Sequence, residues 1–115
     1  MGTLRRKESE ERYQNVVKGG ALERGCVLCS AQAIQTFSHW KVIHNDYPYD
    51  KIAEVHDMLV PLRHITEEEL SAEEKQDLAA LKAGYLNLHY QYLIESFPKN
   101  KSIPDHFHLH LVVVK

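Results

Sequence analysis

Apolar and polar positions along the chain predict both helices and strands. Residues 4–18 combine helix-forming and charged side chains, and a glycine pair at 19–20 ends them, which predicts a short solvated helix. Residues 38–44 and 54–60 carry apolar side chains in loose alternation and predict two strands. The sequence NDYP at 45–48 has turn composition and separates them.

A longer helix is predicted to begin at one of two capping boxes, Thr66–Glu69 or Ser71–Glu74. After these boxes, apolar side chains recur at helical spacing, at Leu78, Leu81, Tyr85, Leu88 and Tyr92. The end of this helix stays open, because residues 90–94 also alternate as a strand would. A proline-bounded loop at 98–104 precedes a last strand, which we expect over 106–114. The pattern predicts an α+β fold.

The length of 115 residues corresponds to one folded domain, and we expect a helical extension over 1–24 followed by the main domain over 25–115. The net charge of −2 gives no basic field for nucleic acid. No apolar run approaches the roughly 20 residues of a membrane helix. We therefore expect a cytoplasmic protein that binds neither nucleic acid nor a membrane.

Three histidines, His106, His108 and His110, alternate with apolar residues in the segment HFHLHLVVV. In a strand they would share one face and span roughly 13 Å, too far for all three to bind one metal ion. Their roles should therefore differ. The plainer interpretation is three half-buried structural histidines, although each imidazole would then need partners for two nitrogens.

The two cysteines form a Cys26-x-x-Cys29 pair. In a reducing compartment this spacing indicates metal binding or redox chemistry before it indicates a structural disulfide. The pair is also compatible with two small buried side chains.

The segment HFHLHLVV resembles the triad of the histidine triad (HIT) family. A second similarity lies upstream, where IHNDYP at 43–48 and VHDMLVPLRHI at 55–65 look like that family's nucleoside-binding strands. The resemblance covers about residues 26–115. It implies a HIT-like fold, with an antiparallel sheet, one long helix packed on it and a short N-terminal helix. It also implies a homodimer that hydrolyses or transfers nucleoside monophosphates.

The resemblance further implies a role for each site residue. His108 would be the nucleophile, and His110 would donate to a phosphate oxygen. Asn45 would contact the ribose, although a turn-forming role explains it equally well. Apolar side chains would form the base pocket, with Val42, Ile43 and Leu59 as candidates. A structural zinc ion would be bound by Cys26, Cys29, His64 and His106.

One position departs from the family pattern and bears on the leaving group. Many members carry a serine three positions before the first triad histidine, where this chain has Ile103. Members also continue past the triad, whereas this sequence ends at Lys115. These departures concern the leaving group. From the resemblance we predict a nucleotidyl hydrolase or transferase that acts on a nucleoside phosphate derivative, with a purine expected. The alternatives are a zinc-stabilised nucleotide-binding module without turnover and a metal-storage protein.

Overall fold

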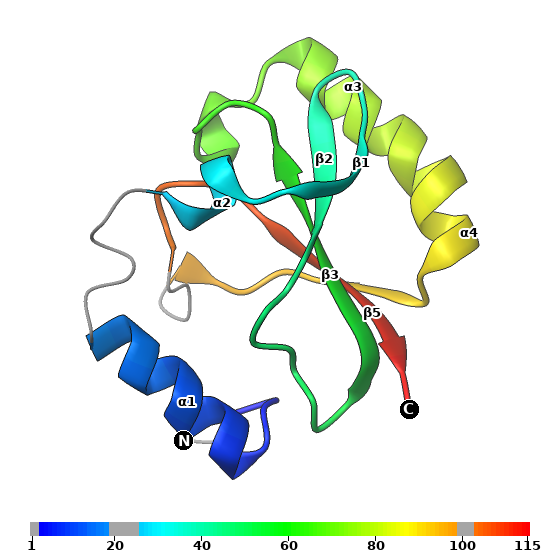
Figure 1. Ribbon diagram of the computed structural model, residues 1–115. Coiled ribbons are helices and arrows are strands. Elements are labelled where there is room, and N and C mark those ends of the chain that lie inside the picture. The colour runs from blue at the N-terminus through cyan, green and yellow to red at the C-terminus, as the bar shows by residue number, and fades with distance from the viewer. Residues whose placement is uncertain (1–2, 19–25, 99–102) are drawn as a thin grey trace.

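The computed structural model describes residues 3–18, 26–98 and 103–115. Its centre is an antiparallel sheet of five strands in the order β1-β2-β3-β5-β4 (Figure 1). The predicted strands at 38–44, 54–60 and 106–114 are confirmed as β2, β3 and β5, with β5 shorter than expected, whereas β1 was not predicted. The strands are β1 Ala33–Thr36, β2 Trp40–His44, β3 Ala53–Pro61, β4 Tyr92–Ile94 and β5 Leu109–Val114.

Both predicted capping boxes form, and each begins a helix. Thr66 caps the 3₁₀ helix η2 (Glu67–Glu69), and Ser71 caps α3 (Ala72–Leu81). The Glu74 carboxylate, 2% exposed, also accepts two hydrogen bonds from Arg63, at 3.1 and 2.5 Å. This ion pair fixes the end of β3 against the start of α3.

The long helix continues from α3 through a π-helical turn, η3 (Lys82–Leu86), into α4 (Asn87–His89). A π turn adds one residue to the helix and rotates everything after it. Leu86 is consequently buried at 5% exposure, and Leu88 points to solvent at 79%. The predicted apolar stripe is therefore wrong at Leu88. The chain then enters β4, which confirms the strand alternative for residues 90–94.

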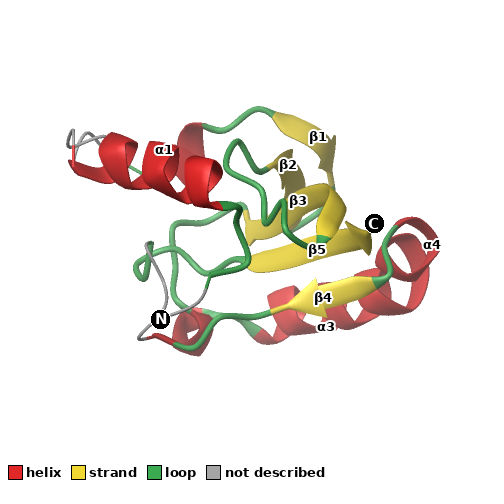
Figure 2. Ribbon diagram, turned by 90° about the horizontal axis from the view of Figure 1, so that it is seen from below, coloured by secondary structure: helices red, strands yellow, loops and turns green. Residues whose placement is uncertain are grey.

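The two faces of the sheet have different partners. Helices α3 and α4 cover one face, and the main core lies between them and the sheet (Figure 2). The helix α1 (Lys7–Lys18), shorter than the predicted 4–18, lies on the other side. The main core contains Trp40, Val42, Leu59, Leu81, Leu86, Phe107, Leu109 and Leu111.

The predicted boundary between extension and main domain, at 24/25, lies outside the described residues. Among the described helices, none combines the length and apolar character that crossing a bilayer demands.

Candidate functional site

The histidine segment places its two kinds of side chain on opposite faces, as the alternation predicts. Phe107, Leu109 and Leu111 enter the main core. The three histidines point to the other face and are all buried, with exposures of 0%, 7% and 5% in chain order. Regular strand structure begins only at Leu109, so the first two histidines lie in the extended segment before β5.

At the start of this segment, four potential metal ligands converge. Their ligand atoms all lie within 4.8 Å of one another. Cys26 Sγ lies 3.3 Å from His106 Nδ1, and Cys29 Sγ lies 3.4 Å from the same nitrogen. Cys29 Sγ also lies 3.3 Å from His64 Nδ1. Two thiolates and two imidazoles at such separations suit a tetrahedral ion with ligands at about 2.0–2.3 Å.

Hydrogen bonds position the cysteine-bearing segment and His106. Cys26 precedes the four-residue helix α2 (Val27–Ser30), which Lys41 ties to β2 by donating to the carbonyls of Cys29 and Ala31, at 3.2 and 2.8 Å. The His106 Nε2 lies 3.1 Å from the Pro61 carbonyl. Its hydrogen is thus used there, and Nδ1 faces the sulfurs as a ligand.

The middle histidine has a defined tautomer. His108 Nδ1 lies 2.9 Å from the backbone carbonyl of His106, which can only accept. Nδ1 therefore carries a proton, and the lone pair of the neutral ring is on Nε2. A neutral imidazole with this arrangement is a competent nucleophile.

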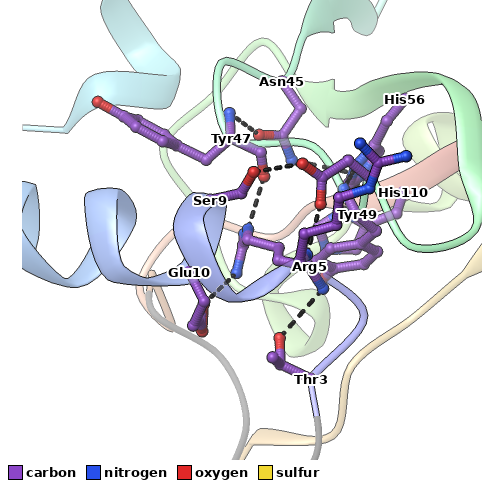
Figure 3. A network of polar contacts seen from close by, with 11 residues as sticks. Thr3, Arg5, Ser9, Glu10, Asn45, Tyr47, Tyr49, His56 and His110 are labelled. Carbon is purple, nitrogen blue, oxygen red and sulfur yellow. Dashed lines mark hydrogen bonds and ion pairs between the residues drawn. The ribbon is translucent and has the colours of Figure 1, made fainter.

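His110 is held by a chain of hydrogen bonds through His56 and Tyr49 (Figure 3). The Tyr49 backbone N–H donates to His56 Nδ1 at 2.9 Å, which places the His56 proton on Nε2. That Nε2–H donates to His110 Nδ1 at 2.8 Å. His110 therefore carries its own proton on Nε2, which lies 3.2 Å from the Tyr49 hydroxyl oxygen.

Both imidazoles of this hydrogen-bonded pair, His56 and His110, are neutral at physiological pH. Burial, and secondarily the charge of Arg5, lowers the pKa of His56 to about 4. Burial, together with the neighbouring histidines and Arg5, lowers the pKa of His110 to about 3. The Nε2–H of His110 is consequently a permanent donor. A ligand oxygen that accepts from this N–H would take the place of the Tyr49 hydroxyl.

Comparison with known proteins identifies the architecture. A HIT family hydrolase from Clostridium thermocellum superposes with a TM-score of 0.56 at 20% identity, over 76% of this chain and 89% of that one. A HIT family hydrolase from Legionella pneumophila gives 0.53 at 18% identity, over 77% and 92%. No protein-family model and no curated protein matches the sequence significantly.

The chain has the HIT fold. The resemblance drawn from the triad and the upstream strands is confirmed at the level of the fold. Within this fold, the predicted metal ligands Cys26, Cys29, His64 and His106 meet in one cluster, and the predicted catalytic pair His108 and His110 lies beside it.

The predicted nucleotide-binding residues are divided between the two faces of the sheet. Val42 and Leu59 pack in the main core at 0% exposure, so they do not line the histidine face. Ile43 does lie on the histidine face, packed with Leu28 and Val60. Asn45 lies at its edge, where its side-chain oxygen accepts from the Tyr47 N–H at 2.8 Å, as in a turn.

Sequence reasoning missed two members of the site, His56 and Tyr49. His56 lies within the motif that supports the family resemblance, but it joins the triad only through the pairing of β3 with β5. That register sets Met58 opposite His110 and so brings His56 within reach. Tyr49 lies in an irregular loop, where no periodicity predicts which way a side chain points.

Proposed function

We propose that this HIT-fold protein is a nucleotidyl hydrolase or transferase that cleaves at the α-phosphate of a nucleoside phosphate derivative. The observation that carries the proposal is the hydrogen bonding of two adjacent imidazoles, whose partners favour complementary tautomers. His108 presents a lone pair on Nε2, and His110 presents a hydrogen on Nε2. Their ring centroids lie 5.3 Å apart at 84°.

In the first step, His108 Nε2 attacks the α-phosphorus. A nitrogen–phosphorus bond forms while the bond to the leaving group breaks, and the leaving group departs with the bonding electrons and takes a proton from solvent. His110 donates to a nonbridging oxygen and stabilises its growing charge. Water then attacks the phosphorus and breaks the nitrogen–phosphorus bond. The nucleoside monophosphate is released, one water proton goes to solvent, and the cycle closes.

The metal cluster supports this site without joining the reaction. We propose that Cys26, Cys29, His64 and His106 bind zinc, which would stabilise the fold around the start of the triad. Four protein ligands leave no position for a substrate, so the role is structural. The chemistry then belongs to His108 and His110.

We also propose that the chain forms a homodimer. The strand β4 lies at the edge of the described sheet, and exposed apolar side chains gather on and near it, namely Leu88, Tyr92, Leu93 and Phe97. Sedimentation at micromolar concentration should give about twice the 13.3 kDa chain mass. A monomer would remove the dimer and leave the chemistry standing.

The test is release of AMP from an adenosine phosphoramidate and from a dinucleoside polyphosphate by the zinc-loaded chain. His108→Asn should bind AMP as the unmodified chain does, while turnover falls by several orders of magnitude. His89→Asn is the matched control, since His89 is exposed on α4 and its one ring contact within the described residues is with Tyr85. Binding of AMP without release from either substrate would favour the second candidate, a nucleotide-binding module.

A further inference from the structure

The segment 3–18 closes over the loop 45–52, next to His110 (Figure 3). Several hydrogen bonds attach it to this loop. The Arg6 N–H donates to Asp50 at 2.6 Å, Ser9 donates to the same carboxylate, and the Lys51 N–H donates to the Leu4 carbonyl at 2.9 Å. The segment is therefore part of the wall around the histidine pair.

Arg5 is the residue of this segment that is directed toward the site. Its guanidinium lies 4.3 Å from the Tyr13 ring centre and 5.0 Å from that of Tyr49. The Tyr49 ring in turn lies 4.8 Å from the ring of His110. The influence of Arg5 on the pKa of both His56 and His110 shows that its charge reaches the pair.

Among the described residues, Arg5 has one carboxylate partner and one backbone carbonyl partner, besides the two tyrosine rings. The side chain is only 11% exposed, and its ion pair with Glu10 is long, at 3.4 Å. Charge-assisted bonds of this kind are usually about 2.7–2.9 Å. Nε donates to the Tyr47 carbonyl at 2.7 Å, so its hydrogen bonds to described residues use Nε and Nη1. Nη2 makes no hydrogen bond to a described residue and is not fully buried, so its hydrogens can bind an anionic ligand.

We propose that Arg5 is a specificity-determining residue that binds the phosphate of an anionic leaving group and so directs the site toward nucleoside polyphosphates. The proposal rests on the proposed function, since it assigns the substrate class of the same site. The α-phosphate accepts from His110 where the Tyr49 hydroxyl lies, and the next phosphate extends toward the Arg5 fork. A planar guanidinium held between two tyrosine rings is preorganised for this contact.

The experiment compares AMP release from a dinucleoside polyphosphate and from an adenosine phosphoramidate whose leaving group is a neutral amine. Arg5→Ala should lower kcat/KM for the polyphosphate by about 10- to 100-fold, the range for one charge-assisted hydrogen bond. The phosphoramidate should change by less than about threefold. Glu10→Gln should favour the polyphosphate by a few-fold, because it removes the competing carboxylate. An equal loss of kcat/KM on both substrates for Arg5→Ala would show that Arg5 only holds the segment in place, and it would overturn the proposal.

Arg12→Ala is the matched control. Arg12 belongs to the same helix but is exposed, and its guanidinium lies 5.8 Å from the Tyr47 ring centre. Neither substrate should respond to it. If the unmodified chain released AMP from neither substrate, the proposed reaction would be wrong. Calorimetry with AMP and ADP would then test separately whether Arg5 binds the second phosphate. ADP should then bind about tenfold more tightly than AMP, and Arg5→Ala should close the gap. Equal affinities in the unmodified chain would overturn the proposal.

Discussion

His106 and His110 lie four residues apart in the histidine segment, yet their surroundings differ in kind. His106 faces two thiol sulfurs and donates behind itself to the Pro61 carbonyl. His110 faces another imidazole and a phenol hydroxyl. The first environment holds His106 as a metal ligand. The second orients the His110 Nε2–H as a donor, and a ligand oxygen can replace the Tyr49 hydroxyl as its acceptor. The same residue type thus serves two purposes because the neighbouring elements differ.

Substitutions in the metal cluster around His106 should have the largest effect on stability. Cys26→Ser and His64→Asn should each lose bound zinc and unfold at markedly lower temperature, because the free energy of metal binding contributes to folding. His39→Asn is the control, since its partly exposed ion pair with Asp77 contributes at most about 1 kcal/mol. Metal analysis and thermal unfolding measure both effects. Zinc-free chain that melts at the same temperature as loaded chain would contradict the structural role.

In the His110 environment, the substitution His110→Asn should leave the zinc content and the melting temperature nearly unchanged. Turnover should fall on the order of 10²–10³-fold, the scale of one lost oxyanion donor. Steady-state kinetics with the adenosine phosphoramidate measure it. If His110→Asn released the zinc as Cys26→Ser does, the separation of the two ends would be wrong.

Much of this division could be predicted from the sequence, because it depends on side-chain alternation and on local motifs. The faces of the triad follow from strand geometry, and the ligand set follows from the resemblance. The shift after η3 could not be predicted, since a π turn leaves no periodic signal in a single sequence. Which face of the sheet Val42 and Leu59 occupy depended on how side chains alternate along their strands, and the loose alternation of 38–44 and 54–60 left that open. Arg5 and Tyr49 reach the site only through tertiary contacts of irregular segments.

Acid should destabilise the part of the site that contains His56 and His110. In the folded chain the pKa of His56 is about 4 and that of His110 about 3, whereas an unfolded histidine has about 6.5. Below pH 6.5 the unfolded chain therefore binds more protons, and the free energy of unfolding should fall by several kcal/mol as the pH approaches 4. Urea unfolding between pH 7 and 4.5 measures the slope.

The matched variant for this prediction is His56→Gln, which keeps hydrogen-bonding capacity but does not titrate. Its stability should depend less steeply on pH than that of the unmodified chain, while His89→Asn should keep the full slope. Acid also protonates metal ligands, but that contribution is common to all three chains. Parallel slopes for His56→Gln and the unmodified chain would contradict the assignment.

The smallest effect concerns the hydroxyl that lies on His110. Tyr49→Phe keeps the ring in contact with His56, at 4.4 Å between centroids, and removes only the oxygen that competes for the His110 Nε2–H. AMP should bind a few-fold more tightly, as expected when a hydrogen bond of about 1 kcal/mol no longer has to be displaced. Tyr92→Phe, on the exposed strand β4, is the control. Weaker AMP binding by Tyr49→Phe would show that the hydroxyl assists the ligand.

The central claim is that one triad is divided between a metal ligand, a nucleophile and a donor. The most direct test is to trap the adduct formed with labelled adenylyl substrate, under basic conditions that preserve phosphorus–nitrogen bonds, and to locate it by mass spectrometry. The account predicts the label on His108 alone, in chain that still holds about one zinc ion, and no label in His108→Asn. Label on His106 or His110 would contradict it, as would an adduct that forms unchanged in His108→Asn.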